Sequence, residues 1–324
     1  MRAVICKEFG PLEGLLIGEA PLPPLRQGCV RIGMKVAALN PPDVLMVQGK
    51  YQVRPQLPFI PGVEGAGTIL EIASDVTGFS HGDRVMTYAG QGCFSEQVVV
   101  PAARVHGIPQ GMTDEVASGF VLAYGTAHHA LVDCGRLARN ETLVVLGAAG
   151  GLGLCAIDIG KAIGARVIAV ASSGAKCATC LAHGADEVID ISAVESLRDA
   201  IKGKVPSGAD VVFDVVGGAA TEASLRAIAP YGRLLIVGYA SGEIPSIKGN
   251  LILLKQASVV GVSFRLLTEQ NPQAATEGIR RLSRMWSNGQ LHPEVTAEFP
   301  LSRVVDALRL LAERKAIGKI ALRI

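Results

Sequence analysis

The sequence lacks an excess of charge of either sign, a long apolar run and a secretion signal. Its 31 Lys and Arg residues nearly balance 29 Asp and Glu residues, and the net charge of +2 is scattered along the chain. A nucleic-acid-binding surface needs a basic stripe, so nucleic acid is not an expected partner. No apolar run is long enough to span a bilayer, and Met1–Glu8 alternates like a strand instead of forming a signal-peptide core. We therefore expect a cytoplasmic protein with no membrane partner.

The cysteines and histidines also lack the spacing of a disulfide framework or a metal site. The seven cysteines are odd in number and spread over a large chain, which favours reduced thiols. Cys177 and Cys180 form one C-x-x-C pair, but it lies inside an expected helix and has no second pair nearby. Adjacent residues on a helix point about 100° apart, so His128 and His129 do not readily share a metal. We expect no metal site.

The sequence does have the length and apolar content of a two-domain α/β enzyme. Hydrophobic residues make up 49% of its 324 residues, which is more chain than one core usually organises. Strand and helix patterns alternate from about 126 to 261, which predicts a Rossmann-type doubly wound parallel sheet with helices on both faces. The expected strands are 142–147, 166–171, 187–190, 209–214, 233–238 and 258–262.

The first 120 residues predict a different architecture, a partly open β-barrel. Their short alternating segments are separated by proline and glycine turns, with expected strands at 28–36, 67–72, 83–87 and 95–100. Two helices, 272–288 and 302–315, precede a last strand, 319–324, which needs a partner in that barrel. The predicted domains are therefore a discontinuous one, 1–122 with 264–324, and a dinucleotide-binding one, 123–263.

A glycine-rich segment follows the first strand of the predicted parallel sheet. Glycines allow a sharp turn there and a close approach of backbone N–H groups and the helix N-terminus to a pyrophosphate. The strand–helix–strand context favours dinucleotide binding, while a purely structural turn remains the alternative. The expected contacts are Gly147, Gly150, Gly151, Leu152 and Gly153, with Gly238 at the end of a later strand.

The end of the second strand indicates which dinucleotide binds. An acid there would accept hydrogen bonds from the ribose hydroxyls of NAD, but the chain has Ser172, Ser173 and Lys176 instead. Hydroxyls and an ammonium group stabilise a 2′-phosphate, so this segment favours NADPH. In the alternative interpretation the serines cap the next helix and Lys176 is a solvated surface charge.

These motifs together resemble the medium-chain dehydrogenase/reductase superfamily, in the zinc-independent quinone oxidoreductase branch that includes zeta-crystallin. The resemblance covers essentially the whole chain and implies that the first domain is a GroES-like catalytic domain. The segments that carry it are 1–4, 40–43, 49–51, 61–67, 82–85, 124–127, the glycine loop and 318–319.

The branch is indicated by the zinc ligands that are missing. The resemblance implies that zinc relatives have a Cys at the turn where this chain has Asn40 or its immediate neighbours, and a His where it has Val63. Between residues 88 and 104 only Cys93 occurs, so the four cysteines of the structural zinc lobe are missing too. Without a Lewis acid, hydride transfer needs an acceptor that is already electrophilic, such as a quinone.

The resemblance also implies the site residues. It places Asn40 and Thr126 beside the nicotinamide, Asp43 and Tyr51 at the substrate cleft, and Lys319 at the cofactor. We take Tyr51, Asn40 and Asp43 as the catalytic candidates, with Tyr51 as a donor to the reduced oxygen. The alternatives are that Tyr51 packs at an edge and that Asn40 shapes a turn. The role of Glu64 is left open, and Ile191 replaces a tyrosine that some relatives place near the cofactor phosphate.

Three functions compete at this point. The first is an NADPH-dependent quinone reductase. The second keeps the chemistry but reduces an enone, a 2-alkenal or an enoyl thioester. The third is a non-catalytic, crystallin-like NADPH-binding protein. The apolar strand 257–262 is expected at the sheet edge, which predicts a homodimer through edge-to-edge pairing.

Overall fold

A parallel sheet organises the middle of the chain. Its strand order is β10-β9-β8-β11-β12-β13. The strands are β8 (Thr142–Leu146), β9 (Arg166–Ala171), β10 (Glu187–Asp190), β11 (Ala209–Asp214), β12 (Ile228–Ile236) and β13 (Ser258–Gly261). The predicted Rossmann-type sheet is confirmed. Strand β12 begins five residues before the predicted strand, and its extra residues include Tyr231 at φ +62, a conformation that strand patterns do not predict.

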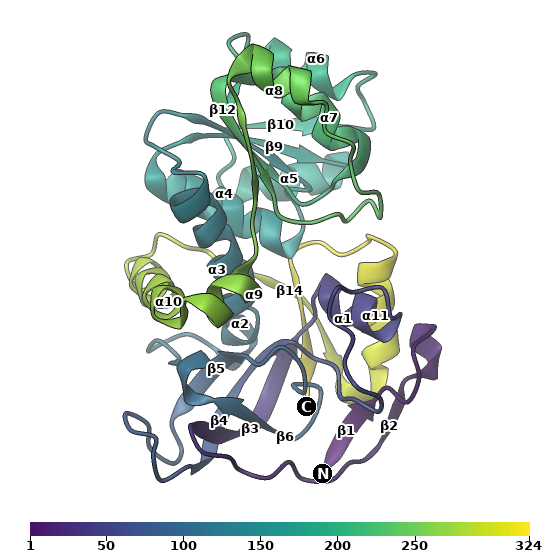
Figure 1. Cartoon of the computed structure of the whole chain (residues 1–324), viewed down its shortest axis with the longest axis vertical. Coiled ribbons are helices and arrows are strands. Elements are labelled where there is room, and N and C mark those ends of the chain that lie inside the picture. The colour runs from purple at the N-terminus through teal and green to yellow at the C-terminus, as the bar shows by residue number, and fades with distance from the viewer. The chain divides into compact units, whose positions relative to one another are not determined.

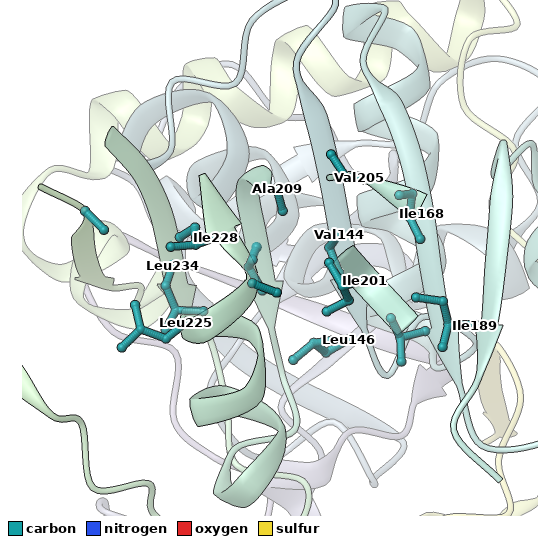
Figure 2. Packing of buried hydrophobic residues seen from close by; sticks show 14 residues of the cluster. Val144, Leu146, Ile168, Ile189, Ile201, Val205, Ala209, Leu225, Ile228 and Leu234 are labelled. Carbon is teal, nitrogen blue, oxygen red and sulfur yellow. The ribbon is translucent and has the colours of Figure 1, made fainter. Parts of the chain in front are cut away.

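Both faces of this sheet are buried. On one face Val144 and Leu146 of β8 pack with Ile168 of β9 and with Ile201 and Leu225 from the covering helices (Figure 2). Their strand neighbours Leu143, Val145 and Val167 point to the opposite face and are fully buried as well. The helices of this region are α3 (Phe120–His128), α4 (Gly151–Ile163), α5 (Gly174–Ala182), α6 (Leu197–Lys204), α7 (Gly218–Ala227), α8 (Gly249–Lys255) and α9 (Phe264–Gln270).

The N-terminal and C-terminal segments form the second sheet, in the order β14-β15-β3-β4-β5-β7 with β6 paired to β3. Its strands are β3 (Cys29–Ala38), β4 (Glu64–Ile72), β5 (Arg84–Tyr88), β6 (Gln97–Pro101), β7 (Val105–Gly107), β14 (Val295–Pro300) and β15 (Lys319–Arg323). Strands β3, β4 and β5 lie side by side in Figure 1. The last strand pairs antiparallel with β3, as expected. Smaller elements are the hairpin β1 (Arg2–Ile5) and β2 (Leu16–Glu19), and the helices α1 (Pro41–Val47), α2 (Asp114–Ser118), α10 (Pro272–Ser287) and α11 (Val304–Ala312).

The computed structural model describes all 324 residues and divides them into two units. The first unit comprises Met1–Leu122, Gln270–Ile279 and Glu294–Ile324, and the second comprises Ala123–Glu269 and Arg280–Pro293. The sequence predicts one domain of 1–122 with 264–324 and another of 123–263. None of the helices combines the length and the apolar character needed to cross a bilayer.

Candidate active site

Asp43 joins the first turn of α1 to the loop that precedes β4. Its Oδ2 accepts the backbone N–H of Asn40 at 2.8 Å, and its Oδ1 accepts the N–H groups of Gly62 at 3.2 Å and Val63 at 3.0 Å. The side chain is fully buried. Asp43 is therefore placed to fix the backbone that carries Asn40.

Asn40, Glu64 and Lys319 form a buried polar network in the first unit. Asn40 Nδ2 donates to Glu64 Oε1 at 2.9 Å, and Lys319 Nζ donates to Asn40 Oδ1 at 2.8 Å and to Glu64 Oε1 at 2.9 Å. The second carboxylate oxygen of Glu64 accepts the N–H of Leu122 at 2.9 Å. Glu64 is fully buried, and the Lys319 side chain is 12% exposed.

This network determines the orientation of the Asn40 amide. Its Nδ2 also donates to Ala38 O at 3.2 Å, so both ends of the amide have partners. Asn40 is at the same time the N-cap of α1, so it shapes a turn as well. Glu64, whose role the sequence left open, is the acid that holds Asn40 and Lys319 in place. The signal for it in the sequence was an acid between Val63 and Gly65, shortly before an expected apolar strand.

Burial raises the pKa of Asp43 to about 7, although Lys319 and the N–H of Asn40 favour the ionised form. The nearby Glu64 carboxylate raises it further. In the unfolded chain the group titrates near 3.8. Folding therefore takes up a proton between these two values, and Asp43 contributes stability at acid pH that is lost as the pH rises through its folded pKa.

An Asp43→Asn variant should reveal this contribution. The difference in unfolding free energy between wild type and variant should decrease as the pH rises from about 4 to about 7, by at most about 1.4 kcal/mol per pH unit. Above that window the difference should stay constant. Urea denaturation of both proteins across this range measures it, and parallel pH profiles would show that Asp43 ionises normally in the folded state.

Tyr51 and Thr126 lie in different units. Tyr51 follows the end of α1, is partly exposed, and donates its backbone N–H to Leu45 O at 3.2 Å. Thr126 is buried in α3.

The glycine loop has the geometry of a pyrophosphate cradle. It runs from the end of β8 to the start of α4, with Gly147 at φ +65 and Gly150 as the N-cap of the helix. A Cβ on Gly153 would lie 2.5 Å from the carbonyl oxygens of both Gly147 and Ala148, so only glycine allows the helix to pack this closely on the loop. Together with β9, this is the context that the dinucleotide fingerprint requires.

The segment after β9 contains both a helix-capping serine and a serine beside a cation. Ser173 is the N-cap of α5, and its Oγ accepts the N–H of Lys176 at 3.4 Å. The ammonium of Lys176 lies 3.3 Å from Ser172 Oγ, so a hydroxyl and a cation stand together at the strand end. Asp190, at the end of β10, accepts hydrogen bonds from the backbone and hydroxyl of Ser192. The side chain of Ile191 is exposed.

Sequence reasoning missed the carboxylate that ends β11. Asp214 is fully buried, and its Oδ1 accepts the N–H groups of Val216 at 2.8 Å and Gly217 at 3.0 Å. The hydroxyl of Thr221 donates to Oδ2 at 2.5 Å. Asp214 thus fixes the loop at the carboxyl end of its strand, where ligands gather in such sheets. An acid closing an apolar strand was the available signal.

Asn40, Val63 and Cys93, which the resemblance places at or near zinc-ligand positions of metal-dependent relatives, are all buried. Across all 324 residues, no three His, Cys, Asp or Glu side chains come together in a way that would hold a metal ion.

A nucleotide-binding sheet with its glycine loop, joined in one chain to a barrel-like unit with a buried polar network, defines a dehydrogenase or reductase of two domains. Residues 26–110 match the family model described as alcohol dehydrogenase GroES-like domain, and residues 151–280 match the one described as zinc-binding dehydrogenase. A quinone oxidoreductase-like protein 2 homolog of Nematostella vectensis is 35% identical over 99% of this chain and 88% of its own. This chain belongs to the zinc-independent quinone oxidoreductase branch of the medium-chain dehydrogenase/reductase superfamily.

Solved structures share the whole fold. A probable oxidoreductase from Mycobacterium abscessus is 32% identical, with a TM-score of 0.91 over 100% of this chain and 99% of its own. A mycobacterial protein in complex with NADPH is 27% identical, with a TM-score of 0.94 over 100% of both chains. The fold therefore belongs to oxidoreductases, as expected from the sequence.

Proposed function

We propose that this protein transfers hydride from NADPH to a quinone without the help of a metal. The observation that carries the proposal is the contact of 2.8 Å between Lys319 Nζ and Asn40 Oδ1. Where zinc relatives have a ligand cysteine, this chain has an amide whose oxygen is already engaged by a cation. The glycine loop and the Ser172–Lys176 pair support a phosphorylated dinucleotide, and a structural neighbour is described in complex with NADPH.

The chain's own residues bind and orient the reactants. NADPH, when bound, supplies the hydride and its electron pair. The loop from Gly147 to Gly153 holds the pyrophosphate, and Ser172 with Lys176 holds the 2′-phosphate. Asn40, fixed by Glu64 and Lys319, is the residue that we assign to the nicotinamide, and Thr126, buried in α3, is a second candidate for that role. A quinone needs no Lewis acid, so proximity and a hydrogen bond to the oxygen that becomes anionic are sufficient.

Tyr51 is the residue that we assign to that oxygen. Its hydroxyl is the donor, and Asp43 acts as a positioning residue because its carboxylate accepts only backbone N–H groups, those of Asn40, Gly62 and Val63. All seven cysteines are free thiols, in keeping with the cytoplasmic location that we propose.

The test is a steady-state assay of NADPH oxidation with a panel of quinones, enones and enoyl thioesters, and with NADH as the control cofactor. We expect the highest kcat/KM with NADPH and a quinone. A preference for enones or enoyl thioesters would instead assign the second substrate class. Binding of NADPH without oxidation by any acceptor would identify a non-catalytic protein and contradict the proposal.

Replacing Lys176 with alanine should weaken NADPH binding selectively. A hydrogen bond to a charged group is worth about 1.5–3 kcal/mol, so we expect a rise in the NADPH dissociation constant of roughly 10- to 100-fold. The affinity for NADH should not change, because NADH has no 2′-phosphate. Fluorescence titration measures both.

Two serine variants provide the control for this prediction. Ser172→Ala should weaken NADPH binding without changing stability, whereas Ser173→Ala removes the α5 cap and should lower stability by about 1 kcal/mol. Equal losses of NADH and NADPH affinity in Lys176→Ala would argue against a phosphate site.

We also propose that the protein is a homodimer that pairs through β13. This strand is hydrogen-bonded to β12 on one side, and Leu253 and Leu254 of the preceding helix are 77% and 78% exposed. Val262 N–H donates to Ile236 O at 2.9 Å, so by alternation the N–H of Val259 points to the outer edge.

Val259→Pro should therefore convert the dimer to a monomer while keeping the β12–β13 pairing, because proline removes only an outward donor. Light scattering coupled to size exclusion measures the mass. A monomeric wild type, or a variant that stays dimeric, would refute pairing through this edge.

A further inference from the structure

A cysteine, a histidine and an aspartate meet on the helical segment that precedes β8. His129 Nδ1 lies 2.9 Å from Asp133 Oδ2, and His129 Nε2 lies 3.6 Å from Cys134 Sγ. All three residues belong to the π-helical segment His129–Cys134 of the second unit. None of them has a role in the hydride transfer described above.

The π-helical geometry is what brings the three side chains together. Gly135 N–H donates to Ala130 O at 2.7 Å, a bond that spans five residues instead of four. This wider turn places the residues four and five positions after His129 over the same ring, whereas in an α-helix the fifth would point away. Single π-turns inside helices occur frequently at functional sites.

The hydrogen bonds determine the tautomer of His129. The bond from His129 lowers the pKa of Asp133, so this carboxylate is ionised at neutral pH and only accepts. Nδ1 therefore carries the proton, and Nε2 of the neutral ring is the lone-pair acceptor that faces the thiol. Nucleophile, base and orienting acid thus stand in the order found in enzymes with an activated thiol.

The reactivity of the Cys134 thiol depends on this base. Burial raises the pKa of its thiol, and the Asp133 charge raises it further, so the sulfur is protonated at neutral pH. A protonated thiol reacts when a base removes its proton during the attack, and His129 is in position to do so.

The surroundings of the cluster contain four more titratable or charged groups. His128 is buried, which lowers its pKa, and Arg281 adds positive charge near both His128 and Asp133. Arg233 donates from Nε to Gly135 O at 2.8 Å and pairs with Glu141 at 2.7 Å. The charge of Arg281 favours the ionised form of Asp133 and hence the tautomer described above.

The thiol is also accessible. Cys134 and Cys29 are the two partly exposed cysteines, and the other five are buried. Cys29 lies at the start of β3 and has no histidine beside it, which makes it a matched control within the same molecule.

We propose that Cys134 is a nucleophilic site that forms covalent adducts with α,β-unsaturated carbonyl compounds. Sγ bonds to the β-carbon while the C=C π pair shifts toward the carbonyl oxygen, and the thiol proton passes to His129 Nε2. The imidazolium then returns the proton to the α-carbon, so S–H adds across the double bond and no oxidant is needed. The choice of electrophile rests on the proposed function, because its acceptors are conjugated carbonyl compounds.

N-ethylmaleimide is the probe, and the experiment is run without NADPH, so it does not depend on reductase activity. Rates of alkylation at Cys134 and Cys29 are measured separately by peptide mass spectrometry. We expect Cys134 to react at least about tenfold faster than Cys29 at neutral pH. This rate ratio is below the roughly 100- to 10,000-fold acceleration that a general base typically gives.

His129→Gln should lower the Cys134 rate to about that of Cys29, and Asp133→Asn should lower it partly, because the tautomer is no longer fixed. The Cys29 rate reports on folding in each variant. If His129→Gln unfolds, all seven cysteines react and Asp133→Asn decides the question. A Cys134 rate no higher than that of Cys29, or one unchanged in a folded variant, overturns the proposal.

Discussion

Replacement of Lys319 by methionine is expected to lower the free energy of unfolding by about 3–5 kcal/mol, because it leaves a buried carboxylate without its cation. Lys319 Nζ lies 2.9 Å from Glu64 Oε1, and the two side chains are 12% and 0% exposed. Solvent therefore screens the pair poorly and cannot replace the ammonium. Urea denaturation at neutral pH measures the loss.

Two variants make this result specific. Lys315 pairs with Glu313 on the surface and is 68% exposed, so Lys315→Met should change stability by at most about 0.5 kcal/mol. The double variant Glu64→Gln with Lys319→Met should recover part of the loss, since no unpaired charge remains. A Lys319→Met protein as stable as the Lys315→Met protein would show that the network contributes little to the fold.

The second large effect concerns the glycine loop. A Cβ on Gly150 would meet nothing closer than 3.5 Å, so Gly150→Ala should fold with wild-type stability. Gly150 is the N-cap of α4, where the backbone has to come close to the pyrophosphate, so the added methyl group should weaken NADPH binding by roughly tenfold or more.

Gly153→Ala is the contrasting variant. Its Cβ would lie 2.5 Å from two carbonyl oxygens, so helix α4 must shift, and both stability and NADPH binding should fall, stability by about 1–3 kcal/mol. Parallel denaturation and NADPH titrations separate the two effects. Normal NADPH affinity in Gly150→Ala would place the pyrophosphate elsewhere.

Local patterns predicted much of the fold. The apolar strands of the parallel sheet and the strand–glycine–helix unit are encoded within short segments, and the structure has them where they were expected. The partner of the last strand followed from its position alone. The predicted strand for β12 began five residues too late, because Pro230 and Tyr231 interrupt its pattern. The sheet accommodates this irregularity at the start of the strand.

The candidate site was harder to predict because its contacts are distant in sequence. Glu64 and Lys319 are 255 residues apart, and nothing in the sequence around either residue predicts that they pair. The family resemblance led us to expect Asp43 at the substrate cleft. Its carboxylate accepts the backbone N–H groups of Gly62 and Val63, and contacts to backbone leave no pattern in the sequence. His129 was considered only beside His128, because α-helical spacing brings Asp133 to its ring but points Cys134, five residues on, away from it.

The most direct test of metal-free hydride transfer is single-turnover oxidation of NADPH by a quinone, after treatment with a metal chelator. It compares ordinary NADPH with NADPH carrying deuterium at the transferred position of the nicotinamide. We predict full activity after chelation and a slower reaction with the deuterated cofactor. Loss of activity that returns only when zinc is added, or turnover with NADH alone, would contradict the account.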